Sequence, residues 1–313
     1  TTNIPIIDIS SLRDHSGSKR IANQLHAASQ DVGFIYVTGH GIPEQVIKAV
    51  RRTAFEFFRH PLEDKELVSI SEKHRGWLSN ESAVMEDSAK PDLKESFIWG
   101  YENATSQAWD DHPLRGANLW PPFLPEMRDH AMDYFRHAHD VAHHLLRGFA
   151  LGLNLAEDFF LRSTSRPLSR ASSVYYPSQP EELYENRFGV GPHTDFGVLT
   201  VLCQDDVGGL QVQDLRGEWV PAPPVDGSLV VNVGDLLSRW TEGKYRSTPH
   251  RVINTSGRER LSLVLAFDPE PDTMIDARDV FGPTHKPRDS AISCGDYLNW
   301  RFEKAFAYRR IKR

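Results

Sequence analysis

Residues 193–202 read HTDFGVLTVL, in which a histidine and an aspartate precede an apolar run typical of a β-strand. In a strand, residues two apart point to the same face, so His193 and Asp195 can reach one metal ion from a single edge. No other His-x-Asp occurs in the chain. Taken alone the pair is weak evidence, because such a spacing also arises by chance at protein surfaces.

A third candidate ligand, His250, lies in the segment STPHRV at residues 247–252, which enters a further β-like run. Two imidazoles and one carboxylate on one side of a metal are typical of non-haem Fe(II) oxygenases, because they leave positions open for oxygen and a co-substrate. A structural zinc site would normally be closed and would use cysteines, which this region does not supply in pairs. The same three ligands can bind zinc, so the ligands alone leave the metal open.

Arg260 opens the apolar run RLSLVLAF at residues 260–267. A guanidinium at the edge of a core favours a bidentate carboxylate partner. Ser262 lies on the same strand face and can donate its hydroxyl to that carboxylate. The pattern Arg-x-Ser is uninformative by itself, and its position after His250 gives it meaning.

Short apolar segments separated by Gly, Pro and Asp turns continue on both sides of these motifs, from residue 171 to residue 269. Such a series is typical of double-sheet β structures, including the jelly roll. We therefore predict a mainly β protein with flanking helices. The strands that we expect cover residues 173–176, 197–202, 209–213, 219–220, 228–233 and 261–267.

Helical periodicity lies outside this β region. Apolar side chains three and four apart predict helices over residues 19–32 and 126–151, and residues 296–313 are compatible with a closing helix. We interpret the histidines of the long helix as a polar face, because no carboxylate or cysteine completes a metal-ligand set. These histidines are His130, His137, His139, His143 and His144.

The composition excludes several classes of partner. The chain has 313 residues and a net charge of −7, so it has no basic excess to neutralise nucleic acid or an anionic membrane. No apolar run approaches the roughly 20 residues of a membrane span, and the N-terminus lacks a signal-peptide pattern. We expect a cytoplasmic protein without nucleic-acid or membrane partners. Cys203 and Cys294 are too few for a disulfide framework.

The chain resembles, over nearly its whole length, the iron- and 2-oxoglutarate-dependent dioxygenases of the isopenicillin N synthase-like family. The resemblance rests on many blocks in the same order. Before the metal motif they are IPIID at residues 4–8, GFIYVTGHGI at 33–42, DLKESF at 92–97, NLWP at 118–121 and YYP at 175–177. After it come GGLQV at 208–212, NVGD at 232–235, HRV at 250–252 and RLS at 260–262.

The resemblance implies a distorted double-stranded β-helix (jelly roll) core, with Fe(II) bound by His193, Asp195 and His250. It implies 2-oxoglutarate as co-substrate, with its distal carboxylate held by the side chains of Arg260, Ser262 and Tyr176. One departure concerns the strand of Tyr176, because the family often has asparagine two residues before this tyrosine and the chain has Val174.

Around this centre the expectations extend to the pocket and the second layer of side chains. Phe196 and Phe267 are candidates for the substrate pocket. Asp235 and Asp205 are candidates to support the ligands, on sequence proximity alone. We expect an N-terminal mixed α/β region at 1–165, an oxygenase core at 166–275 and a C-terminal segment with the closing helix at 276–313.

The predicted function is therefore the oxidation of a small organic molecule by molecular oxygen, by hydroxylation, desaturation or cyclisation, with release of succinate and carbon dioxide. Two alternatives stay open. Some members of the family use ascorbate, or the substrate's own electrons, in place of 2-oxoglutarate. More remotely, a zinc-dependent hydrolase or a metal-binding module could use the same fold and ligands. The sequence does not identify the primary substrate.

Overall fold

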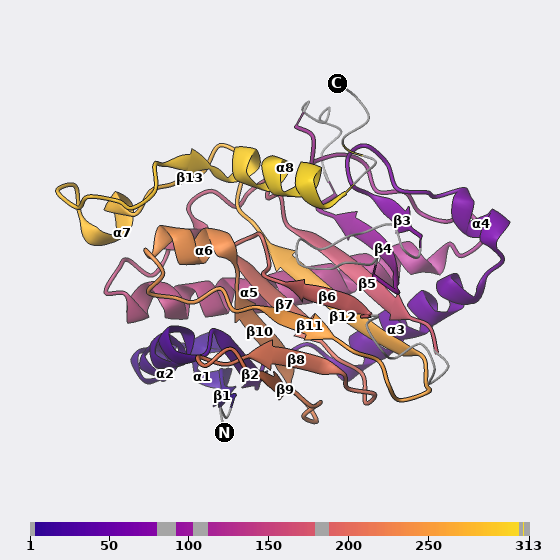
Figure 1. The fold of residues 1–313 in the computed structure, drawn as a ribbon, viewed down its shortest axis with the longest axis horizontal. Helices are drawn as coiled ribbons and strands as arrows, with labels where there is room; N and C mark the ends of the chain where they lie inside the picture. The colour runs from indigo at the N-terminus through magenta and orange to yellow at the C-terminus, as the bar shows by residue number, and fades with distance from the viewer. Residues whose placement is uncertain (1–3, 80–91, 103–111, 179–187, 307–308, 310–313) are drawn as a thin grey trace.

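The computed structural model describes residues 4–79, 92–102, 112–178, 188–306 and 309. Its core is built from two β-sheets, seen in Figure 1. The larger sheet has the order β1-β2-β10-β7-β12-β5-β4-β3, and the smaller has the order β6-β11-β8-β9. The strands of the larger sheet are β1 (Ile6–Asp8), β2 (Phe34–Thr38), β3 (Gly76–Leu78), β4 (Glu95–Gly100), β5 (Arg170–Tyr176), β7 (Leu199–Cys203), β10 (Leu229–Val233) and β12 (Arg260–Phe267).

The smaller sheet closes over the inner face of the larger one. Its strands are β6 (Val190–His193), β8 (Leu210–Gln213), β9 (Trp219–Pro221) and β11 (His250–Val252), and a separate pair is formed by β13 (Met274–Ile275) and β14 (Ile292–Ser293). A buried apolar cluster joins the two sheets, with Phe34 and Tyr36 from the larger and Leu210, Val212 and Val252 from the smaller. This two-sheet arrangement confirms the predicted jelly-roll core, although the sheets do not form a closed barrel.

The antiparallel pair β5 and β12 separates a polar inner face from an apolar outer face. Their register sets Tyr176 opposite Arg260, Val174 opposite Ser262 and Arg170 opposite Ala266. Because side chains alternate along a strand, these residues face the space between the sheets. The intervening leucines of β12 face outward into the main core. The register thus decides which side chains can form a site.

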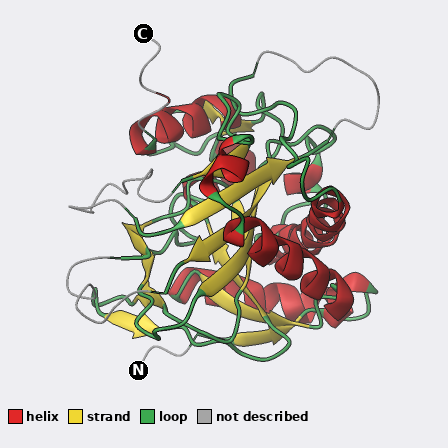
Figure 2. Ribbon diagram, turned by 90° about the vertical axis from the view of Figure 1, so that its right-hand side faces the viewer, coloured by secondary structure: helices red, strands yellow, loops and turns green. Residues whose placement is uncertain are grey.

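Helices cover the outer face of the larger sheet, and Figure 2 shows strands in the middle of the molecule with helices on the outside. The long helix α5 confirms the predicted helix, and it packs on α2, α3, β7 and β12. The helices are α1 (Ser10–Arg13), α2 (Ser18–Asp31), α3 (Glu44–Arg59), α4 (Leu62–Glu66), α5 (Glu126–Gly152), α6 (Asp235–Trp240), α7 (Arg278–Phe281) and α8 (Cys294–Ala305), with a 3₁₀ turn at Phe159–Leu161.

The closing helix α8 begins two residues earlier than the sequence predicts. Ser293 precedes it, and its hydroxyl accepts a hydrogen bond from the backbone N–H of Asp296, which caps the helix start. Phe302 and Phe306 at the end of this segment line the cavity between the sheets. Among the described residues, none of the helices is both long and apolar enough to span a bilayer.

The histidines of α5 do not all form a polar face. The ring of His139 stacks on Phe135 and packs against Phe267, and its Nε2 lies 3.2 Å from the hydroxyl of Ser169. Burial, with a smaller contribution from His143, lowers the pKa of His139 to about 3. The folded protein therefore holds this imidazole neutral at a pH where the unfolded chain protonates it.

This difference predicts an acid-dependent loss of stability. The unfolded chain binds a proton at His139 near pH 6.5 and the folded protein only near pH 3, so the free energy of unfolding falls as the pH drops through this window, by up to about 1.4 kcal/mol per pH unit. We expect His139→Gln to flatten the pH dependence of chemical denaturation between pH 6 and pH 4. His137→Gln, on the same helix with a side chain 38% exposed, is the control and should keep the wild-type slope. Equal slopes in all three proteins would contradict the prediction.

Candidate metal centre and co-substrate pocket

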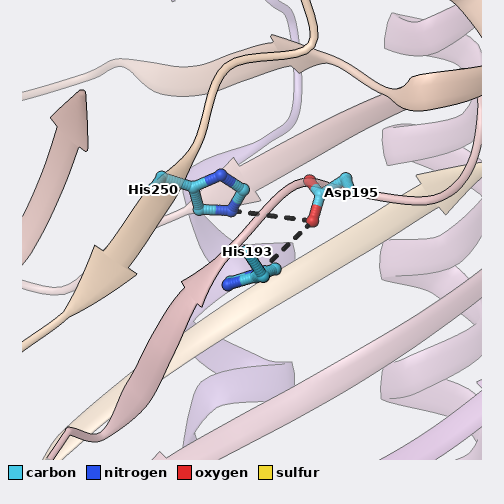
Figure 3. A group of neighbouring side chains, drawn as sticks. All are labelled: His193, Asp195 and His250. Carbon is cyan, nitrogen blue, oxygen red and sulfur yellow. Dashed lines mark ion pairs between the residues drawn. The ribbon is translucent and has the colours of Figure 1, made fainter. Parts of the chain in front are cut away.

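His193, Asp195 and His250 meet between the two sheets, as Figure 3 shows. His193 ends β6 and His250 begins β11, and the two residues are paired in register. Oδ1 of Asp195 lies 3.6 Å from Nε2 of each histidine, and the three candidate ligand atoms lie within 4.8 Å of one another. Two imidazole nitrogens and one carboxylate oxygen therefore surround a common point, an arrangement that fits a single metal ion.

Asp195 reaches this point by a different route from the one that the sequence suggests. It lies in the loop between β6 and β7, so strand alternation does not place it beside His193. The backbone of this loop is held by α6, because the N–H of Asp235 donates to the carbonyl of Asp195 at 2.7 Å and the N–H of Leu236 donates to Gly197. The strand predicted from residue 197 accordingly starts at Leu199.

Hydrogen bonds orient each ligand from behind. Nδ1 of His193 lies 2.8 Å from the carbonyl oxygen of Gly191, and Nδ1 of His250 lies 3.2 Å from that of Thr248. A proton on Nδ1 can be donated to each carbonyl, which leaves the Nε2 lone pairs directed at the shared point. Oδ2 of Asp195 accepts from Asn232 at 2.8 Å and from Thr200 at 2.5 Å, so Oδ1 stays available.

The electrostatics keep His250 and Asp195 in their metal-binding protonation states. Burial, followed by the neighbouring His193, lowers the pKa of His250 to about 4, so its imidazole is neutral at physiological pH. Burial by itself raises the pKa of the Asp195 carboxyl, but the two histidines and the amide of Asn232 outweigh burial and hold the pKa well below its usual range. A neutral His250 imidazole and an ionised Asp195 carboxylate result, which are the forms in which these groups bind a metal.

Asp235 links the metal-ligand loop to the closing helix α8. Its Oδ2 accepts from the hydroxyl of Thr194 at 3.2 Å and pairs with Nη1 of Arg301 at 3.0 Å. The guanidinium of Arg301 lies over the ring of Phe196, 4.3 Å from its centroid. Asp235 is thus a supporting residue of the ligand loop. Asp205, the other candidate, instead accepts from the backbone N–H of Leu261.

The ligands open into a cavity of about 210 Å³ between the sheets. Arg260, Ser262 and Tyr176 line it together with the triad. Arg260 and Ser262 are each 1% exposed, yet Nη1 of Arg260 and Oγ of Ser262 have no hydrogen-bond partner among the described residues. Within the same part of the chain, Arg260 has no carboxylate within salt-bridge distance.

Buried polar groups in folded proteins are almost always paired, so these free donors indicate a missing partner. The partner must carry negative charge, because a buried guanidinium without a counter-charge is costly. The Arg260 Nε–H already donates to the carbonyl of Gly208 at 2.6 Å, and the guanidinium lies 4.7 Å from the ring centroid of Tyr176, which restricts its orientation. A carboxylate-bearing ligand such as 2-oxoglutarate fits these donors.

The two pocket phenylalanines differ in position. Phe196 lines the cavity beside Asp195, whereas the structure does not bring Phe267 there. Ala266 faces the cavity, so the next residue along β12 points outward, and Phe267 packs on His139 and His143 of α5. The sequence analysis did not single out Asn232, Thr200 or Arg170. Arg170 lies an even number of residues from Tyr176 on the same strand, so the two side chains point to the same face, and this alternation could have identified Arg170.

Three metal-ligand side chains that leave positions open, beside a buried arginine without a carboxylate partner among the described residues, are, in a jelly roll, typical of the non-haem Fe(II) oxygenases. Comparisons with known proteins place the chain more narrowly. Residues 4–123 match the N-terminal model of the non-haem dioxygenases in morphine synthesis, and residues 169–269 match the 2OG-Fe(II) oxygenase superfamily. The chain belongs to this superfamily of Fe(II)- and 2-oxoglutarate-dependent oxygenases.

Relatives of known sequence and structure agree with this assignment. The 2-oxoglutarate-Fe(II) type oxidoreductase hxnY of Emericella nidulans is 37% identical over 86% of this chain and 80% of the relative. Homoarginine-6-hydroxylase 2-ODD-C23 of Glycine max is 34% identical over 92% and 90%. A full-length Neurospora crassa protein, crystallised in complex with alpha-KG and thymine, has a TM-score of 0.86 at 26% identity, covering 96% of both chains. The chain is therefore an oxidoreductase that uses Fe(II) and 2-oxoglutarate to oxidise a small organic molecule.

Proposed function

We propose that Nε2 of His193, Oδ1 of Asp195 and Nε2 of His250 hold the Fe(II) ion. We propose further that Nη1 of Arg260 and Oγ of Ser262 bind the distal carboxylate of 2-oxoglutarate. The observation that carries this proposal is the pair of buried, unpartnered donors in the same cavity as the triad. When bound, the iron and the keto acid together activate molecular oxygen for the oxidation of a C–H bond in the substrate.

The residues of the chain contribute orientation and exclusion of water. The carbonyls of Gly191 and Thr248 fix the two imidazoles, and Asn232 and Thr200 fix the carboxylate of Asp195. Fixed ligands avoid reorganisation during the reaction. The phenyl rings of Phe302 and Phe306 from the α8 segment line the other side of the cavity, where they exclude water from the reacting atoms.

We propose that Tyr176 also helps to hold the distal carboxylate, and its ring supports Arg260. The guanidinium of Arg260 lies over this ring, and cross-strand pairing places the two residues opposite each other. Val174, where the family often has asparagine, lies opposite Ser262 and gives the site no further hydrogen bond. The proposed carboxylate contacts therefore come from Arg260 and Ser262 of β12, together with Tyr176 of β5.

The arrangement also bears on the organisation of the chain. We propose that residues 166–275 form the oxygenase core, because the ligands and the carboxylate pocket all lie within it, with residues 1–165 and 276–313 packed around it. Strands β1 to β4 extend the large sheet of this core from the N-terminal region. The cytoplasmic location and the absence of nucleic-acid and membrane partners stay predictions.

Anaerobic reconstitution tests the co-substrate directly. With Fe(II) bound, addition of 2-oxoglutarate should produce the weak visible charge-transfer band of an iron-chelated keto acid. Ascorbate in place of 2-oxoglutarate, or Zn(II) in place of Fe(II), should give no such band. If iron binds and 2-oxoglutarate produces no band, the proposal fails, and ascorbate-dependent oxidation or a zinc-based role takes its place.

A further inference from the structure

Two arginines lie at opposite ends of the strand pair that forms one wall of the cavity. Arg260 is opposite Tyr176 and Arg170 is opposite Ala266. Arg170 and Tyr176 are separated by six residues along β5, or roughly 20 Å at about 3.3 Å per residue. Both arginines line the cavity. The proposed function assigns Arg260 to 2-oxoglutarate and leaves Arg170 unassigned.

The two guanidinium groups differ in their charge partners. Nη1 of Arg170 pairs with Oδ2 of Asp268 at 2.8 Å, and this carboxylate is fully buried and also accepts from the backbone N–H of Val198. Arg260 has no such carboxylate among the described residues. The Arg260 end of the cavity therefore requires an anion, whereas the charge of Arg170 is already balanced.

Arg170 nevertheless keeps donors for a ligand. Within the described part of the chain, its side chain makes one hydrogen bond, from Nη1, which leaves Nε and Nη2 free. The side chain is 14% exposed and lines the cavity. Free N–H groups facing a cavity, on a guanidinium whose charge is balanced, are suited to an uncharged acceptor oxygen.

Two other basic groups near the cavity are balanced in the same way. Lys94 lies at the Arg260 end of the cavity, because Glu95 pairs with Tyr175, and its Nζ lies 3.3 Å from Oδ2 of Asp92. Arg301 is paired with Asp235. His74 is uncharged, because burial and the nearby Arg170 lower its pKa well below the usual range. A carboxylate placed beside Arg170 would be buried next to the carboxylate of Asp268, which already balances the charge of Arg170, and this is unfavourable.

Aromatic side chains complete this end of the cavity. The guanidinium of Arg170 lies over the ring of Phe302, 4.6 Å from its centroid. Phe302 contacts Phe196 edge to face, with ring centroids 5.7 Å apart, and stacks on Phe306 at 5.4 Å. Polar donors from one residue and an apolar wall from three others are typical of sites for small, mostly apolar ligands.

We propose that the primary substrate is an uncharged molecule with a carbonyl oxygen, of an amide or a ketone. This oxygen accepts hydrogen bonds from Arg170, and its apolar body packs against Phe196, Phe302 and Phe306. The inference rests on the proposed function, since it places the substrate in the same cavity as Fe(II) and 2-oxoglutarate. It makes Arg170 a specificity-determining residue.

Matched pairs of neutral and anionic probes test this proposal. The protein is loaded anaerobically with Fe(II) and 2-oxoglutarate and titrated with benzamide against benzoate, phenylacetamide against phenylacetate, and nicotinamide against nicotinate. Binding is read from the change in the visible band. We expect each amide that binds to do so at least tenfold more tightly than its acid. Tighter binding of the acids, or no binding by either member of any pair while the band itself is intact, would overturn the proposal.

Two variants separate recognition from folding. Arg170→Gln should weaken amide binding at least tenfold and leave the 2-oxoglutarate band in place. Asp268→Asn should shift the preference toward the acids, because it removes the charge partner of Arg170 and a merely structural role would not invert the ratio. Circular dichroism checks that the second variant folds, and if it does not, the Arg170→Gln result decides. An absent band in the wild-type protein would instead count against the proposed function.

Discussion

Asp195→Ala should abolish catalytic turnover and weaken Fe(II) binding by more than about 100-fold, since loss of even a supporting residue behind a metal ligand typically lowers affinity about 10–100-fold. The substitution removes the anionic ligand and leaves the two imidazoles, whose ring centroids are 4.2 Å apart. Neither imidazole can compensate the charge of a divalent cation. Anaerobic equilibrium titration with Fe(II) and an assay of succinate release measure the two effects.

Two control variants calibrate this result. Asn232→Ala removes one hydrogen bond to Oδ2 of Asp195 and should reduce iron affinity by an intermediate factor of about 10. Asp206→Ala removes an exposed carboxylate, with a side chain 76% exposed, that pairs only with Arg258 among the described residues, and should change neither quantity. Wild-type turnover in Asp195→Ala would remove the residue from the proposed metal site.

Arg260→Ala should raise the Michaelis constant for 2-oxoglutarate by about 100-fold or more, because breaking one side of a buried charge pair is worth about 3–5 kcal/mol. The guanidinium is the buried cation of the cavity that lacks a carboxylate of its own among the described residues. Iron binding should persist, since Arg260 does not contact the triad. Steady-state kinetics at varied 2-oxoglutarate concentration, with a parallel iron titration, distinguish this loss from that of Asp195→Ala.

Arg258→Ala is the matched control for this experiment. Arg258 lies two residues earlier, with a side chain 60% exposed and bound to Asp206, so its removal should leave the Michaelis constant unchanged. Arg260→Lys should give an intermediate value, because lysine keeps the charge but loses the planar pair of donors. An unchanged constant in Arg260→Ala would show that the distal carboxylate binds elsewhere.

The metal centre could be predicted from the sequence because short motifs mark its residues. The pair His193 and Asp195 occurs once, and His250 and Arg260 each sit at the start of an apolar run. The jelly-roll core followed from short strands and turns. The expected position of Asp195 beside His193 was correct, but strand alternation was not the reason. The loop that is hydrogen-bonded to α6 positions Asp195.

The substrate end could not be predicted in the same way. Arg170 and Asp268 are almost a hundred residues apart, and only the pairing of β5 with β12 brings them together. Phe302 enters from a helix outside the two sheets. The prediction that Phe267 lines the substrate pocket was wrong because neighbouring residues of β12 face opposite sides of the sheet. Ala266 faces the cavity, and Phe267 faces α5.

The residues on two sides of the cavity come from different parts of the fold. The two histidine ligands and the carboxylate donors come from strands and Asp195 from the loop after β6, whereas phenyl groups of the opposite wall come from α8 and the segment after it. In evolutionary terms these parts can change at different rates. Substitutions at Phe302 and Phe306 can change the wall that faces the proposed substrate without replacing a metal ligand, so the same oxygen-activating centre can act on a different molecule.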